Sequence, residues 1–284
     1  MAVYQQTYRP YTGPLTPAAP RFLILYRQAR RSLFQSKLLL GFFVVCFLIP
    51  LLELVAIYIS HNPAFFHLLG LPRFIAINRS FFFTYVHYQC FMAFLFTAFA
   101  APGLIAPDLA NGGLALYLSR PFSRAEYLAG KIVVLWLLLS ALTWVPGLIL
   151  FGVQSDMSGA AWRQANSWLG WSIVLACAVW ILVWSLLALA ISAWVKWRVV
   201  AGAVLLGIYF FGAGFAQVIN LVLGTQYGSL VDLMEVHLIA WSGLFRRPAP
   251  PLGLYLAAWA VLAAIAAGSL WMILKKVRPL EVIK

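Results

Sequence analysis

Residues 105–131, with the sequence IAPDLANGGLALYLSRPFSRAEYLAGK, interrupt a succession of long apolar runs with acids, bases, glycines and prolines. In this stretch Asp108 follows Pro107. This pair favours a helix start, because proline lacks the N–H that is unpaired there and a carboxylate stabilises the positive helix N-terminus. Pro121 follows a leucine-rich turn and is expected to end this first helix. The stretch therefore predicts a short helix that begins near Pro107 and ends before Pro121.

A second helix is predicted to begin two residues after Pro121. Ser123 and Glu126 have the spacing of a capping box, in which each side chain bonds the backbone amide of the other residue. Lys131 lies where this helix continues into the next apolar run. A basic helical hairpin between two apolar runs predicts a surface on which a partner protein docks, and not an active site.

Composition places the rest of the chain in a membrane. Of its 284 residues, 64% are hydrophobic and only 10% are charged, whereas soluble domains average ~25% charged residues. A helix needs about 20 apolar residues to cross the hydrocarbon core of a bilayer. Six runs have that length: 38–60, 81–105, 132–153, 168–194, 199–223 and 252–274. The predicted fold is an all-α polytopic membrane protein, with a disordered cytoplasmic tail at 1–20 and a single transmembrane domain over 21–284.

The basic residues behind the net charge of +13 are concentrated in the segments on one side of the predicted membrane spans, and this distribution does not indicate a nucleic-acid patch. Six Lys and Arg residues precede the first span, three lie between the second and third, two between the fourth and fifth, and four at the C-terminus. The segments on the other side of the membrane hold five. Because basic residues accumulate on the cytoplasmic side, both termini are predicted to be cytoplasmic, and no nucleic-acid partner is expected.

Two further helices are predicted outside the spans. Residues 21–37 place apolar and basic residues on opposite sides of a helix, which is typical of an amphipathic helix at the cytoplasmic interface. A merely basic flank would satisfy the charge rule equally well. Ser229 and Asp232 have the pattern of another capping box, which predicts a short extracellular helix that ends near residues 245–248. Residues 154–167 are expected to link the third and fourth spans.

Four polar residues in the spans are candidates for a gate or a substrate path. Glu53 and His87 lie at similar predicted depths in antiparallel spans, and an intramembrane carboxylate is a functional candidate by default. They form either a latch between the two spans or separate contacts, in which Glu53 reaches interfacial water and His87 makes a structural hydrogen bond. Gln217 and Asn220 follow the glycine-rich part of the fifth span, where small and polar residues suit either a path lining or helix packing.

The cysteines and histidines do not predict a metal site. Cys46, Cys90 and Cys177 lie inside apolar runs and are expected to be buried thiols. His61 and His67 are close in sequence between the first and second spans, but no acid or cysteine joins them. A plain connecting loop is therefore favoured over a metal site.

The stretch 105–131 resembles the first cytoplasmic loop of ABC type-2 exporter permeases. An acid is followed by a glycine pair, a leucine-rich turn and the motif S-R-P-x-S-R-x-x-Y-x-x-G-K, which enters a span. The residues that carry the resemblance are Asp108, Gly112, Gly113, Leu116, Leu118, Ser119, Pro121, Ser123, Arg124, Gly130 and Lys131. The six predicted spans extend the resemblance along the whole chain.

This resemblance implies a cytoplasmic coupling helix between the second and third spans, seated on a separate ABC ATPase subunit. The residues assigned to ATPase coupling are Asp108, Gly112, Gly113, Leu116, Arg120, Pro121, Ser123, Arg124, Glu126 and Lys131. It also implies a dimer of identical or different permease subunits, surrounded by lipid in the bacterial cytoplasmic membrane. The expected activity is export of a hydrophobic or amphipathic substrate. ATP and magnesium are expected on the partner ATPase, and this chain is expected to hold no cofactor.

Missing motifs separate this function from other classes. The sequence has no G-x-x-x-x-G-K-[ST] motif, so the chain is not expected to hydrolyse ATP itself. It also lacks the motifs of zinc proteases and serine hydrolases, which disfavours a polytopic enzyme. The alternative from another class is a non-transporting membrane scaffold or assembly factor with the same fold. Partnership with an ATPase would distinguish the two.

Overall fold

The computed structural model describes residues 21–62, 76–111, 124–248 and 250–277, and every regular element in these residues is a helix. Within them, six helical segments are long and apolar enough to cross a membrane. These segments are Lys37–His61, Arg79–Asp108, Ala125–Asn166, Trp168–Trp194, Arg198–Leu223 and Leu252–Lys276. The six predicted apolar spans are therefore confirmed as helices, and the third is longer than predicted.

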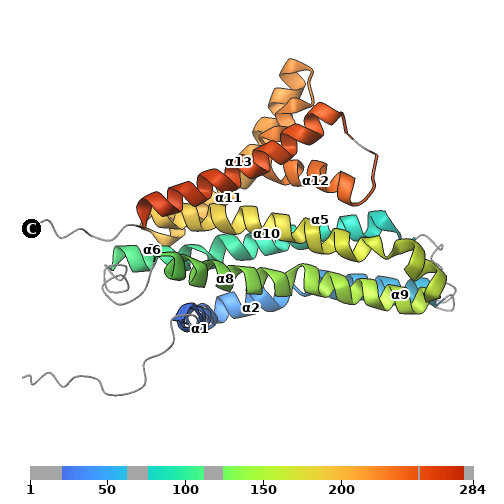
Figure 1. Cartoon of the computed structure of the whole chain (residues 1–284), viewed down its shortest axis with the longest axis horizontal. Coiled ribbons are helices and arrows are strands. Elements are labelled where there is room, and N and C mark those ends of the chain that lie inside the picture. The colour runs from blue at the N-terminus through green and yellow to red at the C-terminus, as the bar shows by residue number, and fades with distance from the viewer. Residues whose placement is uncertain (1–20, 63–75, 112–123, 249, 278–284) are drawn as a thin grey trace, which may run out of the picture.

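The spans and the helices around them are arranged as shown in Figure 1. The first half of the chain forms α1 (Arg21–Phe34), α2 (Lys37–Val45), α3 (Leu48–His61), α5 (Arg79–Ala100), α6 (Pro102–Ala110) and α8 (Arg124–Leu142). The second half forms α9 (Trp144–Asn166), α10 (Trp168–Trp194), α11 (Arg198–Leu223), the 3₁₀ helix η1 (Tyr227–Leu230), α12 (Leu233–Leu244) and α13 (Leu252–Lys276).

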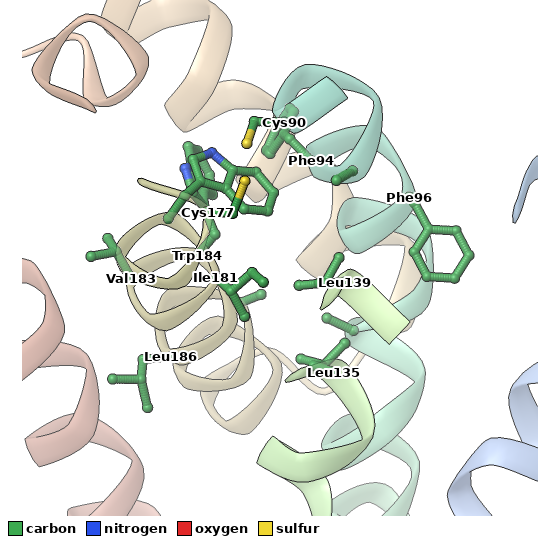
Figure 2. Close-up of a cluster of buried hydrophobic side chains, with 14 of the residues drawn as sticks. Cys90, Phe94, Phe96, Leu135, Leu139, Cys177, Ile181, Val183, Trp184 and Leu186 are labelled. Carbon is green, nitrogen blue, oxygen red and sulfur yellow. The ribbon is translucent and has the colours of Figure 1, made fainter. Parts of the chain in front are cut away.

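α10 is the central helix of the bundle and packs against α5, α6, α8, α9 and α13. It is apolar on all sides, and most but not all of its side chains are buried against the other helices. Figure 2 shows part of this core, where Phe94 of α5 and Trp184 of α10 lie with ring centroids 4.6 Å apart. Cys90 and Cys177 lie in the same cluster, and all three cysteines are buried free thiols, as predicted.

Prolines break two of the spans near their middle. The first span changes from α2 to α3 after Cys46, and the third changes from α8 to α9 at Thr143. Pro50 and Pro146 have no N–H, so each leaves a carbonyl four residues earlier without its helical donor. These carbonyls belong to Cys46 and Leu142. A polar donor from another helix must replace the missing bonds, because the bilayer core offers no water.

Gln89 of α5 supplies both missing bonds. Its side-chain Nε2 donates to the carbonyl of Cys46 at 3.1 Å and to the carbonyl of Leu142 at 2.5 Å. The hydroxyl of Tyr85, one turn earlier on α5, donates to the carbonyl of Thr143 at 2.8 Å. Both side chains are fully buried. A single helix thus holds the breaks of two neighbouring spans.

Gly147 permits this close approach of α9 to α5. A Cβ at this position would lie 2.8 Å from Cγ2 of Ile173 and 2.9 Å from Cε1 of Tyr85. A larger residue would therefore push the break of the third span away from the hydroxyl of Tyr85.

The prediction of a loop at 154–167 is wrong, because α9 continues through Asn166. Gly159 interrupts the helix with the non-helical angles φ 83° and ψ 179°, and the residues on both sides of this kink are helical. Two of the polar side chains in this stretch contact each other, and one of them also contacts α3. Gln154 donates to Oγ of Ser158 at 2.8 Å, and Nε2 of His61 lies 3.1 Å from the same oxygen. These contacts allow polar residues in a helix next to α3.

The two helices predicted outside the spans are present. In α1, Ala29 and Leu33 are buried while Arg27 and Arg31 are exposed, and the helix packs across α8. Figure 1 shows α1 nearly end-on beneath α8, at a large angle to the bundle. The amphipathic pattern of residues 21–37 is therefore confirmed as a helix with one buried side.

α12 is the short helix predicted between the fifth and sixth spans, but its cap was assigned to the wrong residue. The side chain of Asp232 accepts from the amides of Met234 and Glu235 at 2.9 and 3.3 Å. Ser229 instead belongs to η1, where its hydroxyl accepts from the side-chain amide of Asn220. The extra turn of η1 moves the helix start to Leu233. Figure 1 shows α12 in the wedge where α11 and α13 diverge from the bundle.

We expect Gln89→Met to destabilise the protein, because two buried carbonyls lose their donors while the side chain keeps its length. A buried unsatisfied group costs about 1–3 kcal/mol. The measurement is thermal unfolding in detergent. Thr97→Val is the matched control, because Thr97 is equally buried on α5 but bonds only the carbonyl of Ala93 in its own helix.

A second change tests the cause of that loss. Pro146→Ala restores an N–H four residues after Leu142, so the double variant with Gln89→Met should recover part of the lost stability. Equal melting temperatures for Gln89→Met and Thr97→Val would show that Gln89 does not hold the breaks.

Candidate functional site

The helix that leads into residues 105–131 begins at Pro102, and not near Pro107 as predicted. α5 ends at Ala100, and Pro102 occupies the first position of α6, where a missing N–H is tolerated. Pro107 lies inside α6 and Asp108 lies near its end. The carboxylate therefore does not stabilise a helix N-terminus. Both prolines fit a helix start by sequence, and the packing of α6 on α10 favours the earlier one.

Asp108 and Lys131 join the two ends of the predicted docking loop. Nζ of Lys131 lies 2.8 Å from Oδ2 of Asp108, and the hydroxyl of Tyr127 donates to the same oxygen at 2.8 Å. The side chains of Lys131 and Asp108 are 9% and 20% exposed, so little water screens the pair. The sequence predicted both residues as coupling residues, and the structure brings them together, with each satisfying the charge of the other.

Two side chains from other spans hold the junction of α5 and α6. Oγ of Ser192 on α10 accepts from the amide of Ala106 at 3.1 Å and donates to the carbonyl of Pro102 at 3.3 Å. Nη2 of Arg198, the first residue of α11, donates to the carbonyl of Phe99 at 3.2 Å. The start of the predicted docking loop is therefore bonded to α10 and α11 as well as to α8.

Much of the predicted docking surface lies outside the described residues. This applies to Gly112, Gly113, Leu116, Arg120, Pro121 and Ser123, and to the side chain of Arg124. Glu126 is described, and it is half-buried in the first turn of α8. The coupling roles assigned to these residues remain predictions.

Glu53 and His87 lie on packed helices, α3 and α5, but in the described residues no ion pair or hydrogen bond joins them. Both side chains are half-buried. The imidazole of His87 stacks on the ring of Tyr88, with centroids 5.3 Å apart. The structure thus agrees with separate contacts better than with a direct latch.

Gln217 and Asn220 differ in their surroundings although both belong to α11. The side chain of Asn220 is engaged: Oδ1 accepts from the amide of Gly228 at 2.8 Å, and Nδ2 donates to Ser229 at 3.2 Å. It therefore holds η1 against the end of α11. Gln217 is exposed, close to exposed Phe215 and Val218. The proposed path role fits Gln217 better than Asn220.

α12 contains a buried histidine that the sequence did not single out. The Nδ1–H of His237 donates to the carbonyl of Leu233 at 2.7 Å, and Nε2 has no partner among the described residues. Burial lowers the pKa of His237 to about 4. On the opposite side of α12, two positions earlier in the helix, Glu235 lines a cavity of about 370 Å³ together with Arg247. Burial, and then the charge of Asp232, raises the pKa of Glu235.

The residues that the sequence analysis missed are polar groups bonded to distant backbone atoms. Gln89 and Ser192 belong to this group, as does Arg198, which was noted only as a basic flank. A signal for Gln89 was present, because the mid-span prolines Pro50 and Pro146 each require a donor for a carbonyl. Nothing local in the sequence indicates which side chain provides it.

No set of three or more histidine, cysteine or acidic residues suited to a metal ion occurs in the described part of the chain. His61 contacts the carbonyl of Ile57 and Ser158. His67 lies outside the described residues.

We expect Lys131→Met to destabilise the protein by roughly 2–4 kcal/mol, because it leaves the carboxylate of Asp108 poorly compensated. Adding Asp108→Asn should recover part of this loss. Arg163→Met is the control, since the Arg163–Asp156 pair is 4.0 Å long and its side chains are 58% and 90% exposed. Thermal unfolding of the wild type, Lys131→Met, Asp108→Asn, the double variant and the Arg163→Met control measures the coupling. A double variant as unstable as the sum of the singles would contradict the pairing.

His237 predicts a loss of stability in acid. Its pKa is lower in the fold than in the unfolded chain, so the unfolded state gains a proton first as pH falls below about 6.5. Between about pH 7 and about pH 5 the loss should be roughly 2 kcal/mol. Glu235 acts in the opposite direction, because its raised pKa favours the protonated fold.

Thermal unfolding of the wild type and of His237→Gln over this pH range isolates the effect. Glu235 is unchanged in the variant, so the difference between the two pH profiles reports His237 alone. Parallel profiles would show that His237 is not buried in its neutral form.

A search of curated proteins found no match to the chain. A family model described as "ABC-2 family transporter protein" matches residues 24–230, which include α2 to α11 and the stretch 105–131. This match covers most of the chain and agrees with the six helical segments that could span a membrane, and the chain belongs to the ABC-2 family of transporter membrane proteins.

Proposed function

We propose that this chain is the transmembrane subunit of an exporter, acting in a dimer of identical or different subunits with two copies of a separate ATPase. In this proposal both termini are cytoplasmic, residues 105–131 dock on the ATPase, and ATP and magnesium bind only to that partner. The substrate is hydrophobic or amphipathic. The apolar side chains exposed along α2, α3 and α11 support this substrate class.

The clamp between Asp108 and Lys131 is the observation that carries the proposal. It joins the end of α6 to α8 at 2.8 Å, so a push on the residues between them acts on the second and third spans together. Ser192 bonds α6 to α10, and α8 also packs against α10. A movement of the ATPase would therefore reach the central helix of the bundle by two routes.

The proposed substrate path runs along the exposed side of α11. This side carries large apolar residues and one exposed amide, that of Gln217. Asn220 would support the end of the path by holding η1. Glu53 and His87 would act at the gate as separate groups on α3 and α5, and not as a direct pair.

The proposal predicts that a soluble ATPase with a P-loop co-purifies with the tagged protein in mild detergent. Reversing the charge of the loop with Arg120→Glu and Arg124→Glu should abolish this association, because the docking surface is basic. The measurement is identification and quantification of the co-purified protein by mass spectrometry.

Arg163→Glu is the matched control for that experiment. It reverses one exposed charge on α9, whose label lies at the end of the bundle opposite to that of α6 in Figure 1, and should leave the association intact. Absence of an ATPase under several detergents would favour a non-transporting scaffold. If the Arg163→Glu protein also failed to co-purify with the ATPase, the loss would not be specific to the loop, and residues 105–131 would no longer be assigned as the docking site.

A further inference from the structure

A groove lies between α5 and α11 beside the junction that leads into residues 105–131. Its volume is about 260 Å³, far above the ~30 Å³ share of one water. The lining consists of Ala98, Phe99, Arg198, Val199, Gly202, Ala203 and Leu206. Apart from the guanidinium of Arg198, every lining side chain is apolar. Such a cavity favours an apolar occupant over water.

The groove follows α11 from the end of the span toward its interior. Val199, Gly202, Ala203 and Leu206 recur at the spacing of one helix face. From Arg198 to Leu206 the groove extends about 12 Å at 1.5 Å per residue. The small residues make it hollow, and Gly202 sets its floor, since a Cβ there would lie 2.8 Å from the carbonyl of Ala98.

Arg198 provides the only charge in this lining. One N–H of its guanidinium bonds the carbonyl of Phe99, and a guanidinium has five N–H donors. Among the described residues Arg198 has no acidic partner, and Lys196 lies exposed two positions earlier. Val199 and Trp197 beside it are exposed. An anion can therefore reach the guanidinium from the end of the span.

We propose that this groove binds a phospholipid, with its phosphate on Arg198 and the upper part of one acyl chain along Val199, Ala203 and Leu206. A cation at the end of a span, continued by an apolar groove toward the membrane interior, matches the order of phosphate and acyl chain in a lipid. The lipid would lie against the α5–α6 junction, which Arg198 already bonds. This inference concerns a structural ligand and does not depend on the transported substrate.

A second copy of the chain fits the groove less well. Arg198 would need an acid from that copy, and the chain has only seven acids. Asp108, the described acid closest in sequence to the groove residues of α5, is already paired with Lys131. A phosphate needs no such partner, because it brings its own negative charge.

The test counts lipids that remain bound to the purified full-length protein, by native mass spectrometry during titration with phosphatidylglycerol. We expect one tightly held lipid per chain. Arg198→Gln should weaken its binding about tenfold, because it removes a charge-assisted contact. Ala203→Phe should abolish the binding while keeping the charge, and Ala203→Leu, a smaller change, should weaken it. Lys275→Gln, an exposed cation on α13, is the control and should bind as the wild type does.

Several outcomes would overturn the proposal. Equal losses in Arg198→Gln and Lys275→Gln would mean that the lipid responds only to general charge. A free-anion site would be indicated by two results together. Calorimetry would show that inorganic phosphate binds equally well to the wild type and to Ala203→Phe, and the lipid count of Ala203→Phe would be unchanged. If the Ala203→Leu protein were monomeric where the wild type is dimeric, and still bound its lipid, the groove would be an interface between two copies of the chain. Because no ATPase is present, these results are independent of the docking experiment.

Discussion

The side-chain amide of Gln89 is the contact on which the arrangement of the first three spans depends. Two prolines free two carbonyls inside the bilayer, and one buried side chain on α5 donates to both. Tyr85 adds a third bond to the same region. Because a membrane interior offers no water to an unpaired carbonyl, the first and third spans can break where they do only while α5 remains packed against both α3 and α9. The breaks in the first and third spans therefore both depend on side chains of the second span.

A similar arrangement recurs where α5 meets α6. Pro102 interrupts the helix, and side chains from α10 and α11 bond the backbone around the break. Asp108 and Lys131 then join the end of α6 to α8. The predicted docking loop is therefore connected at both ends to spans that are themselves bonded to the central helix. Such a connection lets a displacement of the loop reach the bundle without passing through a flexible hinge.

Several predicted features were confirmed because they depend on composition and periodicity over many residues. The six spans follow from the length of apolar runs, and α1 and α12 follow from amphipathic and capping patterns. The predictions that proved wrong involve a choice between equivalent local signals. Pro102 and Pro107 both suit a helix start, Ser229 and Asp232 both suit a cap, and polar residues 154–166 suit either a loop or a helix beside a partner.

The sequence by itself determined that this chain is a helical membrane protein, how many spans it has and which stretch between them differs from the rest, because burial in lipid demands long apolar runs. Only the tertiary structure decided that Gln89 bonds two broken spans and that Asp108 pairs with Lys131. These contacts join residues distant in sequence. Their formation depends on helix rotation and packing at the level of single side chains, which no local pattern encodes.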